Sequence, residues 1–431
     1  MVDISSNCGG IKSPNPFWLA SAPPANSGGQ IQRAFEAGWG GAVWKTLGQP
    51  IQNVSSRFGG IDYRGLKNIG FNNIELITDR PLESNFREIY ETKKRYPKHA
   101  IIVSLMVETR DEWRDIIKRA IDAGADGLEL NFGCPHGMCE RGMGSAVGQE
   151  PKVNTEITSW AVDYSTVPVL VKLTPNVANI VPHGLAAQKG GAHGVSLINT
   201  IKSIIGVDIE TFVPQPLVDG RSTNGGYCGA AVRPIALHMC GALAREPGFN
   251  IPISGIGGIT NWRDAVEFML LGSSSVQVCT EVMLRGYRIV EDMIEGLTEY
   301  MERKGFNKLD DFIGKAVPNF TEWGELDLNF ETVAKIDASK CIGCHLCVVA
   351  CDDGAHQCIH PPPAGQGGGI EPASRVPVID EAECVGCNLC KIVCPVPDCI
   401  SMVEVDNGFA RASWNDHTGL GKPLRPKKAA H

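Results

Sequence analysis

The sequence predicts an α/β chain in which a closed barrel of eight parallel strands and eight helices precedes a small cysteine-rich α+β domain. Two observations support this prediction. Apolar strand-like runs alternate with amphipathic helical patterns over about 300 residues, and ten of the sixteen cysteines fall between Cys341 and Cys399. The alternation is typical of a parallel sheet covered by helices. The crowding of cysteines divides the chain in two.

The elements of the barrel are expected in regular order. The predicted strands are 17–22, 41–47, 100–107, 126–130, 167–175, 193–200, 251–259 and 274–280. Helices are expected over 30–37, 85–96, 111–123 and 152–164, and a long insertion spans 49–83. Eight such units suit a closed barrel, whose usual size is about 250 residues with insertions allowed. An open doubly wound sheet is the alternative, but the chain has no G-x-G-x-x-G motif for its usual dinucleotide site.

Polar residues stand where a barrel would bring them together. They end separate predicted strands: Ser21, Lys45, Asn131, Lys172, Asn199 and Thr200. In a barrel these carboxyl ends converge on one mouth, where active sites of this fold lie. Contact with solvent explains one or two polar strand ends, but it explains poorly the two lysines that follow apolar runs.

The loop over residues 131–149 combines a thiol with a flexible backbone. Cys134 and Pro135 follow a predicted buried strand, and the loop contains five glycines. We interpret the loop as a lid that carries its own acid. A structural role for Cys134 is the alternative, because free cysteines are among the most often buried residues.

The segment from Ser254 to Ile259 is rich in glycine and lies between the seventh predicted strand and a helix. Glycines there let backbone N–H groups and a helix N-terminus approach a phosphate. The loops after strands seven and eight are the usual phosphate site of this fold, which also implicates Cys279 and Thr280. The pattern predicts a phosphate-bearing cofactor, with a tight glycine turn as the alternative.

Two cysteine quartets repeat the spacing Cys-x2-Cys-x2-Cys-x3-Cys, which is the pattern of two-cluster ferredoxins. Because each close triplet holds one cluster while the fourth cysteine reaches the other, we expect two [4Fe-4S] clusters. The first is assigned to Cys341, Cys344, Cys347 and Cys394, and the second to Cys384, Cys387, Cys390 and Cys351. Zinc is the weaker alternative, since zinc sites use two separated pairs of ligands.

Three residues around the quartets depart from a standard module. Asp352 stands where the usual pattern has proline, and the loop from 352 to 380 is long. Cys358 and Cys399 fall outside both quartets, and we interpret them as packing residues. None of these departures removes a cluster ligand.

Clusters of this kind move single electrons, so a barrel with an organic cofactor beside them indicates an electron-transfer enzyme. Its cofactor must exchange one electron with a cluster and two with a substrate. Flavin does both, whereas nicotinamide alone does not.

Composition excludes several other roles. The chain has 40 basic and 48 acidic residues, a formal net charge of −8, and no basic stripe interleaved with aromatics, so nucleic-acid binding finds no support. No apolar run reaches the roughly 18 residues of a membrane span, and the start lacks the layout of a secretion signal. Because the sequence shows no secretion signal, its sixteen cysteines favour metal or redox use in the cytoplasm over structural disulfides.

With these residues identified, the chain resembles the dihydropyrimidine dehydrogenases, and its barrel part also resembles dihydroorotate dehydrogenase. The resemblance covers Asn15 to about Met402 and includes the segments NNIELI, NFGCP, VKLTPN, GIGGI and VQVCT. It implies reduction of uracil or thymine to the 5,6-dihydropyrimidine in pyrimidine catabolism, a CH–CH oxidoreduction. Hydride would come from FMN, and Cys134 would donate the proton.

The resemblance also implies a set of contacts. FMN would be held by Ser21, Lys45, Thr46, Lys172, Gly229, Ile256, Gly257, Gly258, Cys279 and Thr280. Substrate would meet Asn73, Asn131, Phe132, Gly133, Asn199 and Thr200. Asparagine amides suit a uracil ring, since both carry hydrogen-bond donors and acceptors. Longer family members often have serine at the position of Gly133.

Within that family the chain resembles the form in which the pyrimidine-reducing part is a separate subunit. Longer members also carry FAD and NADPH domains that are missing here. We therefore expect a partner subunit that binds FAD and NAD(P)H and feeds electrons through the clusters, in a dimer or hetero-oligomer. A dihydroorotate dehydrogenase type of oxidoreductase and a non-catalytic electron-transfer module are the alternatives.

The expected domains follow from these assignments. Residues 1–328 should form the FMN-binding barrel with the pyrimidine site, and residues 329–405 the domain with two [4Fe-4S] clusters. The basic tail, residues 406–431, is expected to be flexible.

Overall fold

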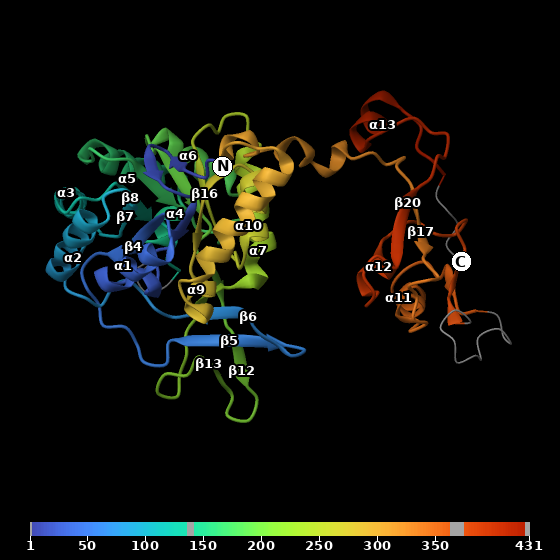
Figure 1. The fold of residues 1–431 in the computed structure, drawn as a ribbon, viewed down its shortest axis with the longest axis horizontal. Coiled ribbons are helices and arrows are strands. Elements are labelled where there is room, and N and C mark those ends of the chain that lie inside the picture. Colours follow the sequence, from blue (N-terminus) through green and yellow to red (C-terminus); the bar gives the residue numbers. More distant parts are fainter. Residues whose placement is uncertain (1, 136–141, 363–374, 427–431) are drawn as a thin grey trace. The chain divides into compact units, whose positions relative to one another are not determined.

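The computed structural model describes residues 2–135, 142–362 and 375–426. The chain divides into two compact units, Met1–Phe320 and Thr321–His431 (Figure 1). The first unit contains the barrel, and the second contains the cysteine-rich module.

The barrel is closed, and its parallel strands follow one another in chain order. Its strands are β3 (Phe17–Leu19), β4 (Gly41–Leu47), β7 (Ala100–Leu105), β8 (Gly127–Asn131), β9 (Val169–Lys172), β10 (Gly194–Leu197), β15 (Ile253–Ile256) and β16 (Ser273–Val278). Each overlaps one of the eight predicted strands. The prediction of a closed eight-stranded α/β barrel is confirmed.

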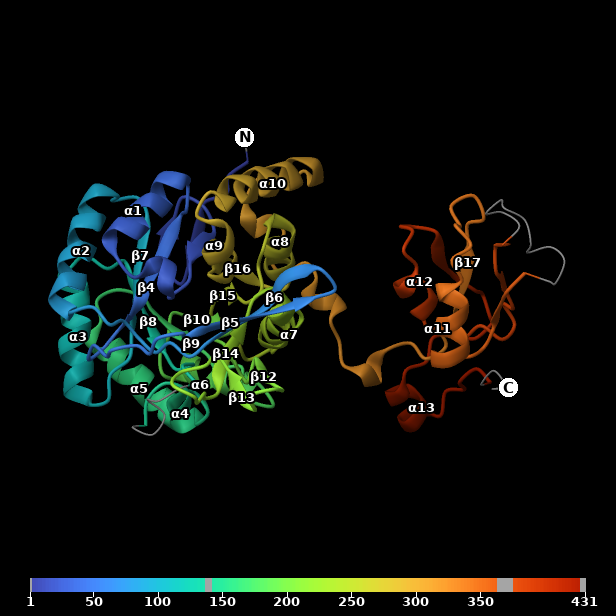
Figure 2. The ribbon, with the colours of Figure 1, turned by 90° about the horizontal axis from the view of Figure 1, so that it is seen from below.

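Helices surround the strands, as Figure 2 shows. They are α1 (Gly28–Ala37), α2 (Leu82–Arg95), α3 (Arg110–Asp122), α5 (Pro151–Tyr164), α6 (Val181–Lys189), α7 (Arg233–Ala244), α8 (Trp262–Leu270), α9 (Thr280–Arg285) and α10 (Ile289–Lys304). Side-chain caps fix several starts: Ser27 accepts from the Gln30 amide, and Thr109 forms a capping box with Glu112. Among the described residues, no helix is long and apolar enough to cross a membrane.

The barrel strands are buried along their length because helices cover one face and the barrel interior the other. Every residue of β4 and β7 is buried. The interior also contains a polar layer around Glu129, which is fully buried. The Gln277 amide donates to Glu129 Oε2 at 3.0 Å and to Ser254 Oγ at 3.2 Å.

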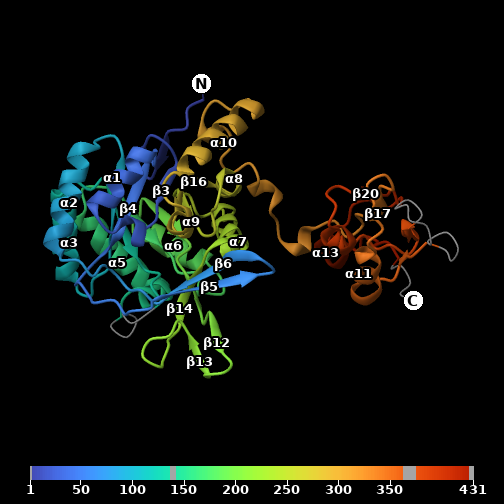
Figure 3. The ribbon, with the colours of Figure 1, turned by 60° about the horizontal axis from the view of Figure 1, so that its bottom comes forward.

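Antiparallel insertions cover the end of the barrel opposite the N-terminus (Figures 1 and 3). One sheet has the order β11-β14-β6-β5, and β12 pairs with β13. Their bounds are β5 (Phe58–Tyr63), β6 (Leu66–Asn73), β11 (Ile201–Ser203), β12 (Gly206–Asp208), β13 (Val213–Gln215) and β14 (Gly225–Cys228). A hairpin of β1 (Ser6–Cys8) and β2 (Ile11–Ser13) precedes the barrel, and the short α4 (Ser145–Gly148) precedes α5. Of these insertions, the sequence predicts only the one over 49–83.

The second unit is a small α+β domain, as predicted. Its elements are β17 (Thr332–Ile336), α11 (Leu346–Gly354), β18 (Ile359–His360), β19 (Val378–Ile379), α12 (Leu389–Val393), β20 (Ile400–Glu404) and α13 (Trp414–Leu420). β17 pairs with β20, and β18 with β19. Its core is built largely from cysteines.

The segment expected to be a flexible tail differs from that expectation. It contains α13, whose start is fixed by a capping box of Ser413 and Asp416. Asn329 Nδ2 donates to the Ala410 carbonyl at 2.7 Å, and Asn329 Oδ1 accepts from the Arg425 amide at 2.9 Å. Residues 406–426 therefore pack on the start of this unit, through pairs the sequence pattern did not reveal. Residues 427–431 of the predicted tail lie outside the described part.

Candidate active site and cluster pockets

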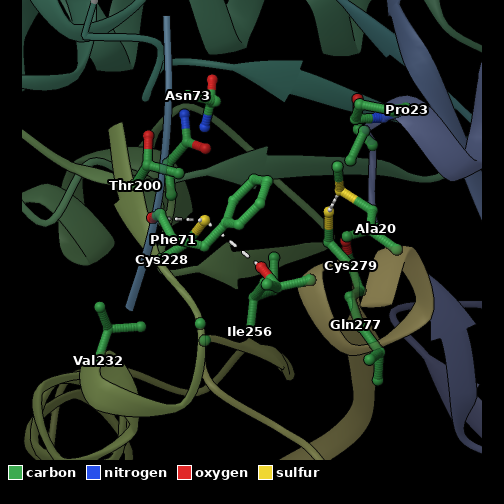
Figure 4. A pocket seen from close by; sticks show the side chains of 18 of the residues that line it. Ala20, Pro23, Phe71, Asn73, Thr200, Cys228, Val232, Ile256, Gln277 and Cys279 are labelled. Carbon is green, nitrogen blue, oxygen red and sulfur yellow. Dashed lines mark hydrogen bonds between the residues drawn. The ribbon is translucent and has the colours of Figure 1, made fainter. Parts of the chain in front are cut away.

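A cavity of about 160 Å³ opens among the carboxyl ends of the barrel strands and residues of β6 and β14. Figure 4 shows part of its wall. All ten residues expected to hold the cofactor line it: Ser21, Lys45, Thr46, Lys172, Gly229, Ile256, Gly257, Gly258, Cys279 and Thr280. Of the residues expected at the substrate and the acid, Asn73, Asn131, Asn199, Thr200 and Cys134 also line it.

Two expected substrate contacts lie differently. The Phe132 side chain is 1% exposed and packs edge-to-face on Trp113, with ring centroids 6.5 Å apart, so it points into the core rather than the cavity. Gly133 does not line the cavity either, and a Cβ built there would lie 2.4 Å from Cβ of Asn199. Phe132 therefore supports the loop from behind, and Gly133 permits Asn199 to approach.

One hydroxyl joins the ends of four consecutive barrel strands. Thr46 Oγ1 lies 3.1 Å from Ser21 Oγ and 2.9 Å from Ser104 Oγ, and it accepts from Asn131 Nδ2 at 3.0 Å. These residues come from the end of β3, from β4, from β7 and from β8. Since a hydroxyl has one donor and two acceptor positions, its hydrogen-bonding capacity is fully used.

Asn131 connects this hydroxyl to the loop that carries the thiol. Its Oδ1 accepts from the amides of Gly133 and Cys134, each at 3.2 Å. The Cys134 carbonyl accepts from the Ser145 amide at 3.1 Å, which closes the other end of the loop. Cys134 is 6% exposed and packs with Met106 and Met143. The described ends of the loop thus hold the thiol in place, while residues 136–141 of the expected lid lie outside the described part.

Two buried lysines, one from β4 and one from β9, line the cavity. Lys45 Nζ lies 2.7 Å from Glu75 Oε1, and both side chains are almost fully buried. Lys172 Nζ lies 3.8 Å from Glu129 Oε1, an oxygen with no hydrogen-bond partner. Buried lysines are rare unless paired with a carboxylate. Glu75 was not predicted, although an acid inside the apolar run NNIELI could have indicated it.

Amide and hydroxyl groups line one side wall. Asn73 Nδ2 donates to the Gly226 carbonyl at 3.2 Å, and Thr200 lies against the same glycine. Figure 4 shows Asn73 and Thr200 on the same side of the cavity. The strand pair of β6 and β14 therefore brings Asn73 to residues that lie far from it in the sequence.

The glycine turn after β15, called the cradle together with Gly229, lies so close to neighbouring residues that no side chain fits there. Gly257 has φ +129° and Gly258 has φ +73°, values that favour glycine. A Cβ at Gly258 would lie 2.8 Å from the Arg233 amide nitrogen and 2.9 Å from the Gly229 carbonyl oxygen. A turn of glycines at the cavity wall lets backbone approach a ligand closely, and together with the buried lysines it fits a planar cofactor that carries a phosphate.

Two further thiols line the cavity from different walls (Figure 4). Cys228 Sγ donates to the Phe71 carbonyl at 3.3 Å and accepts from Thr280 Oγ1 at 3.4 Å. Cys279 Sγ lies 3.6 Å from Met283 Sδ. Burial raises the pKa of Cys228 to about 11 and raises the pKa of Cys279 well above its usual range. Both thiols are therefore neutral at pH 7.

The second unit contains two pockets lined by cysteines. One is lined by the first predicted quartet, Cys341, Cys344, Cys347 and Cys394. The other is lined by the second, Cys384, Cys387, Cys390 and Cys351. Among the described residues, no group of three or more His, Cys, Asp or Glu forms a site for a single metal ion. Four thiols spread around a pocket instead fit a cluster of several irons.

Comparison with known proteins agrees with both units. The family model described as dihydroorotate dehydrogenase matches residues 4–301, and the model described as 4Fe-4S dicluster domain matches residues 334–402. The NAD-dependent dihydropyrimidine dehydrogenase subunit PreA of Escherichia coli is 41% identical over 359 residues, 83% of this chain and 87% of that protein.

Two other relatives extend the comparison. The chloroplastic dihydropyrimidine dehydrogenase (NADP(+)) of Arabidopsis thaliana is 41% identical over 337 residues, 75% of this chain and 79% of that protein. The catalytic subunit of dihydroorotate dehydrogenase B (NAD(+)) of Pyrococcus horikoshii is 36% identical over 315 residues, 72% of this chain and 96% of that protein. The resemblance found in the sequence is confirmed.

Replacing Thr46 by valine should weaken the mouth of the barrel. The change leaves the Asn131 amide and two serine hydroxyls short of a partner, and we expect a loss of about 2–3 kcal/mol in the free energy of unfolding. Urea denaturation of the full chain measures it. Thr298→Val, which removes a single hydroxyl bond to the Ile294 carbonyl, is the control and should cost about 1 kcal/mol or less. Equal losses in the two variants would contradict the role of Thr46.

Cys228 should react slowly with iodoacetamide at neutral pH. Burial raises its pKa to about 11, so its thiolate is at least about 100-fold scarcer than that of an ordinary cysteine. Because the pKa is raised, labelling should increase steadily with pH up to about 11. Mass spectrometry of the Cys228 peptide measures the rate, with a free cysteine peptide as control. A rate that levels off below pH 9 contradicts this prediction.

Proposed function

Because this chain belongs to the dihydropyrimidine dehydrogenase family, within the wider dihydroorotate dehydrogenase family, we propose that it reduces uracil or thymine to the 5,6-dihydropyrimidine. One observation carries the proposal. The Cys134 thiol and three asparagine amides line a single cavity together with two buried lysines. That set can bind a neutral ring through its edges and give it a proton.

The residues of the cavity fit FMN. The cradle of Gly229, Gly257 and Gly258 would hold the phosphate, and Lys45 and Lys172 would lie beside the ring system. Bound there, FMN would supply the hydride and exchange electrons one or two at a time. Ser21 would contact it, and Thr46, whose bonding positions are filled, would hold Ser21 in place through their hydrogen bond.

The amide and hydroxyl side chains of one cavity wall would select the substrate. Asn73, Asn199 and Thr200 present donors and acceptors that match the carbonyl and N–H groups of uracil. A carboxylate, as in orotate, is bound most strongly beside an unpaired cation. Among the described residues that line the cavity, the only cations are Lys45 and Lys172, and each is paired with a glutamate. A neutral pyrimidine is therefore favoured.

Cys134 would protonate C5 of the ring while C6 receives the hydride, so that both atoms of the double bond gain one hydrogen. An ordinary thiol has a pKa of about 8.5 and is mostly protonated at neutral pH, as an acid must be. Asn131 binds the Cys134 amide, so in this structure it positions the acid. We expected it to contact the substrate, and that contact stays a proposal.

Electrons would reach the flavin through the two clusters of the second unit. The matching dicluster model supports the clusters, and the relative from Escherichia coli is named as a subunit and as NAD-dependent. We propose a partner subunit that binds FAD and NAD(P)H, in a dimer or hetero-oligomer. The cytoplasm stays the expected compartment, because a reducing environment keeps so many cysteines free to bind iron.

The test is a turnover assay on the isolated full chain loaded with FMN and iron–sulfur clusters. After reduction with dithionite, addition of uracil or thymine should reoxidise the flavin, and orotate should do so at least about 100-fold more slowly. NADH alone should reduce nothing. Faster reaction with orotate would favour dihydroorotate dehydrogenase activity, and absence of bound flavin and of pyrimidine-dependent reoxidation would favour a pure electron-transfer module. Reduction by NADH without a partner would refute the partner subunit.

Replacing Cys134 by alanine should retain FMN and lose most pyrimidine turnover. General acids typically contribute about 10²–10⁴-fold, and Cys134 is the acid in this proposal. Stopped-flow reoxidation of the reduced flavin by uracil measures the loss. Cys8→Ala is the matched control, because Cys8 is a buried cysteine that does not line the cavity. Near-normal turnover of Cys134→Ala would remove the thiol from the mechanism.

A further inference from the structure

Each cluster pocket contains a fifth cysteine that the ligand quartets do not use. Cys399 lines the pocket of Cys341, and Cys358 lines the pocket of Cys384. Both are buried, with 2% and 3% exposure. The spacing that identified the quartets assigned neither residue a role.

The backbone places these two cysteines equivalently. The Cys399 carbonyl accepts from the Asp337 amide at 2.8 Å, and the Cys358 carbonyl accepts from the Asp380 amide at 2.8 Å. Each of these aspartates then accepts, through its own carbonyl, the amide of the first ligand of the neighbouring quartet at 3.0 Å. The residues before the two cysteines have φ of +54° and +58°. Both cysteines also directly precede a strand, β20 or β18. The fifth thiol is therefore part of the repeat.

Their side chains contact corresponding ligands. Cys358 Sγ lies 3.6 Å from Sγ of Cys351, the ligand that reaches across from the other quartet, and within hydrogen-bonding reach of Cys384. Cys399 lies within reach of the corresponding pair, Cys394 and Cys341, and its Sγ also lies 3.8 Å from the Asp337 carbonyl oxygen, which competes with them for its one S–H. A fifth thiol in each pocket thus contacts the crossing ligand and the first ligand of the triplet.

We infer that Cys358 and Cys399 are positioning residues of the clusters, each donating an S–H hydrogen bond to a ligand thiolate of its own pocket and raising the reduction potential of that cluster. When the quartets bind iron, their sulfurs are thiolates and accept hydrogen bonds. A hydrogen bond to a ligand sulfur is one of the factors that set the potential of an iron–sulfur cluster. It stabilises the reduced, more negative form.

This inference rests on the proposed function, because it needs clusters in both quartets. It replaces the interpretation of the two cysteines as packing residues, and the two ideas differ in what they require. Packing requires only volume, so alanine and serine would leave the potential unchanged. A hydrogen bond requires a donor, so serine should preserve the potential and alanine should not.

The experiment is an anaerobic redox titration of the full chain loaded with clusters, followed by electron paramagnetic resonance, with iron and sulfide content measured per chain. In Cys358→Ala, the reduced-to-oxidised ratio of one cluster at fixed solution potential should fall about tenfold, a shift of about 59 mV for one electron. In Cys399→Ala, the ratio of the other cluster should fall. In the serine variants, the reduction potential of each cluster should equal or exceed that of the parent chain. Cys240→Ala, a buried cysteine of the barrel, should match the parent.

Two results overturn the inference. One is full iron content with unshifted potentials in both alanine variants, and the other is a serine variant that titrates below the parent. If an alanine variant loses iron, the serine variant at that site decides by the same criterion. A parent chain that binds no iron would instead refute the clusters, and with them the proposed function.

Discussion

The Thr46 hydroxyl is the contact on which the geometry of the barrel mouth depends. It joins Ser21, Ser104 and Asn131, so one oxygen fixes the ends of four neighbouring strands relative to one another. A hydroxyl buried among apolar strands is costly unless its hydrogen bonds are made. Because all its bonding positions are used, any movement of one strand end must break a bond to another. One hydroxyl therefore ties the four strand ends into a single hydrogen-bonded group.

Hydrogen bonds connect the Thr46 hydroxyl, through Asn131, to the loop that carries Cys134. Asn131 Nδ2 donates to Thr46, and Asn131 Oδ1 accepts from the amides of Gly133 and Cys134, so the thiol is held relative to β4 as well as to its own strand. Lys45 and Lys172 also line the cavity, but each is paired with a glutamate, Glu75 or Glu129, so the two ion pairs add no net charge. Among the described residues, the cavity presents no unpaired cation to an anionic ring, which suits the neutral ring proposed here.

The sequence predicted those parts whose evidence is local. Parallel buried strands are short apolar runs and cysteine ligands have fixed spacings, so the eight barrel strands and both quartets could be located from the chain alone. What it missed depends on partners far along the chain. β6 pairs with β14, and Asn73 bonds a carbonyl 153 residues away. The inward turn of Phe132 onto Trp113 also needs a neighbouring helix to be in place.

The cores of the two units differ in composition. The barrel buries a large apolar cluster, whereas six of the eleven buried residues in the core of the second unit are cysteines, Cys347, Cys351, Cys358, Cys384, Cys390 and Cys399. Four of these belong to the quartets, so the residues that would bind iron are also the residues that fill the core. If the quartets bind iron as proposed, the ligand bonds add to this limited apolar packing. We therefore expect folding of the second unit to be coupled to cluster assembly, while the barrel contains its own core.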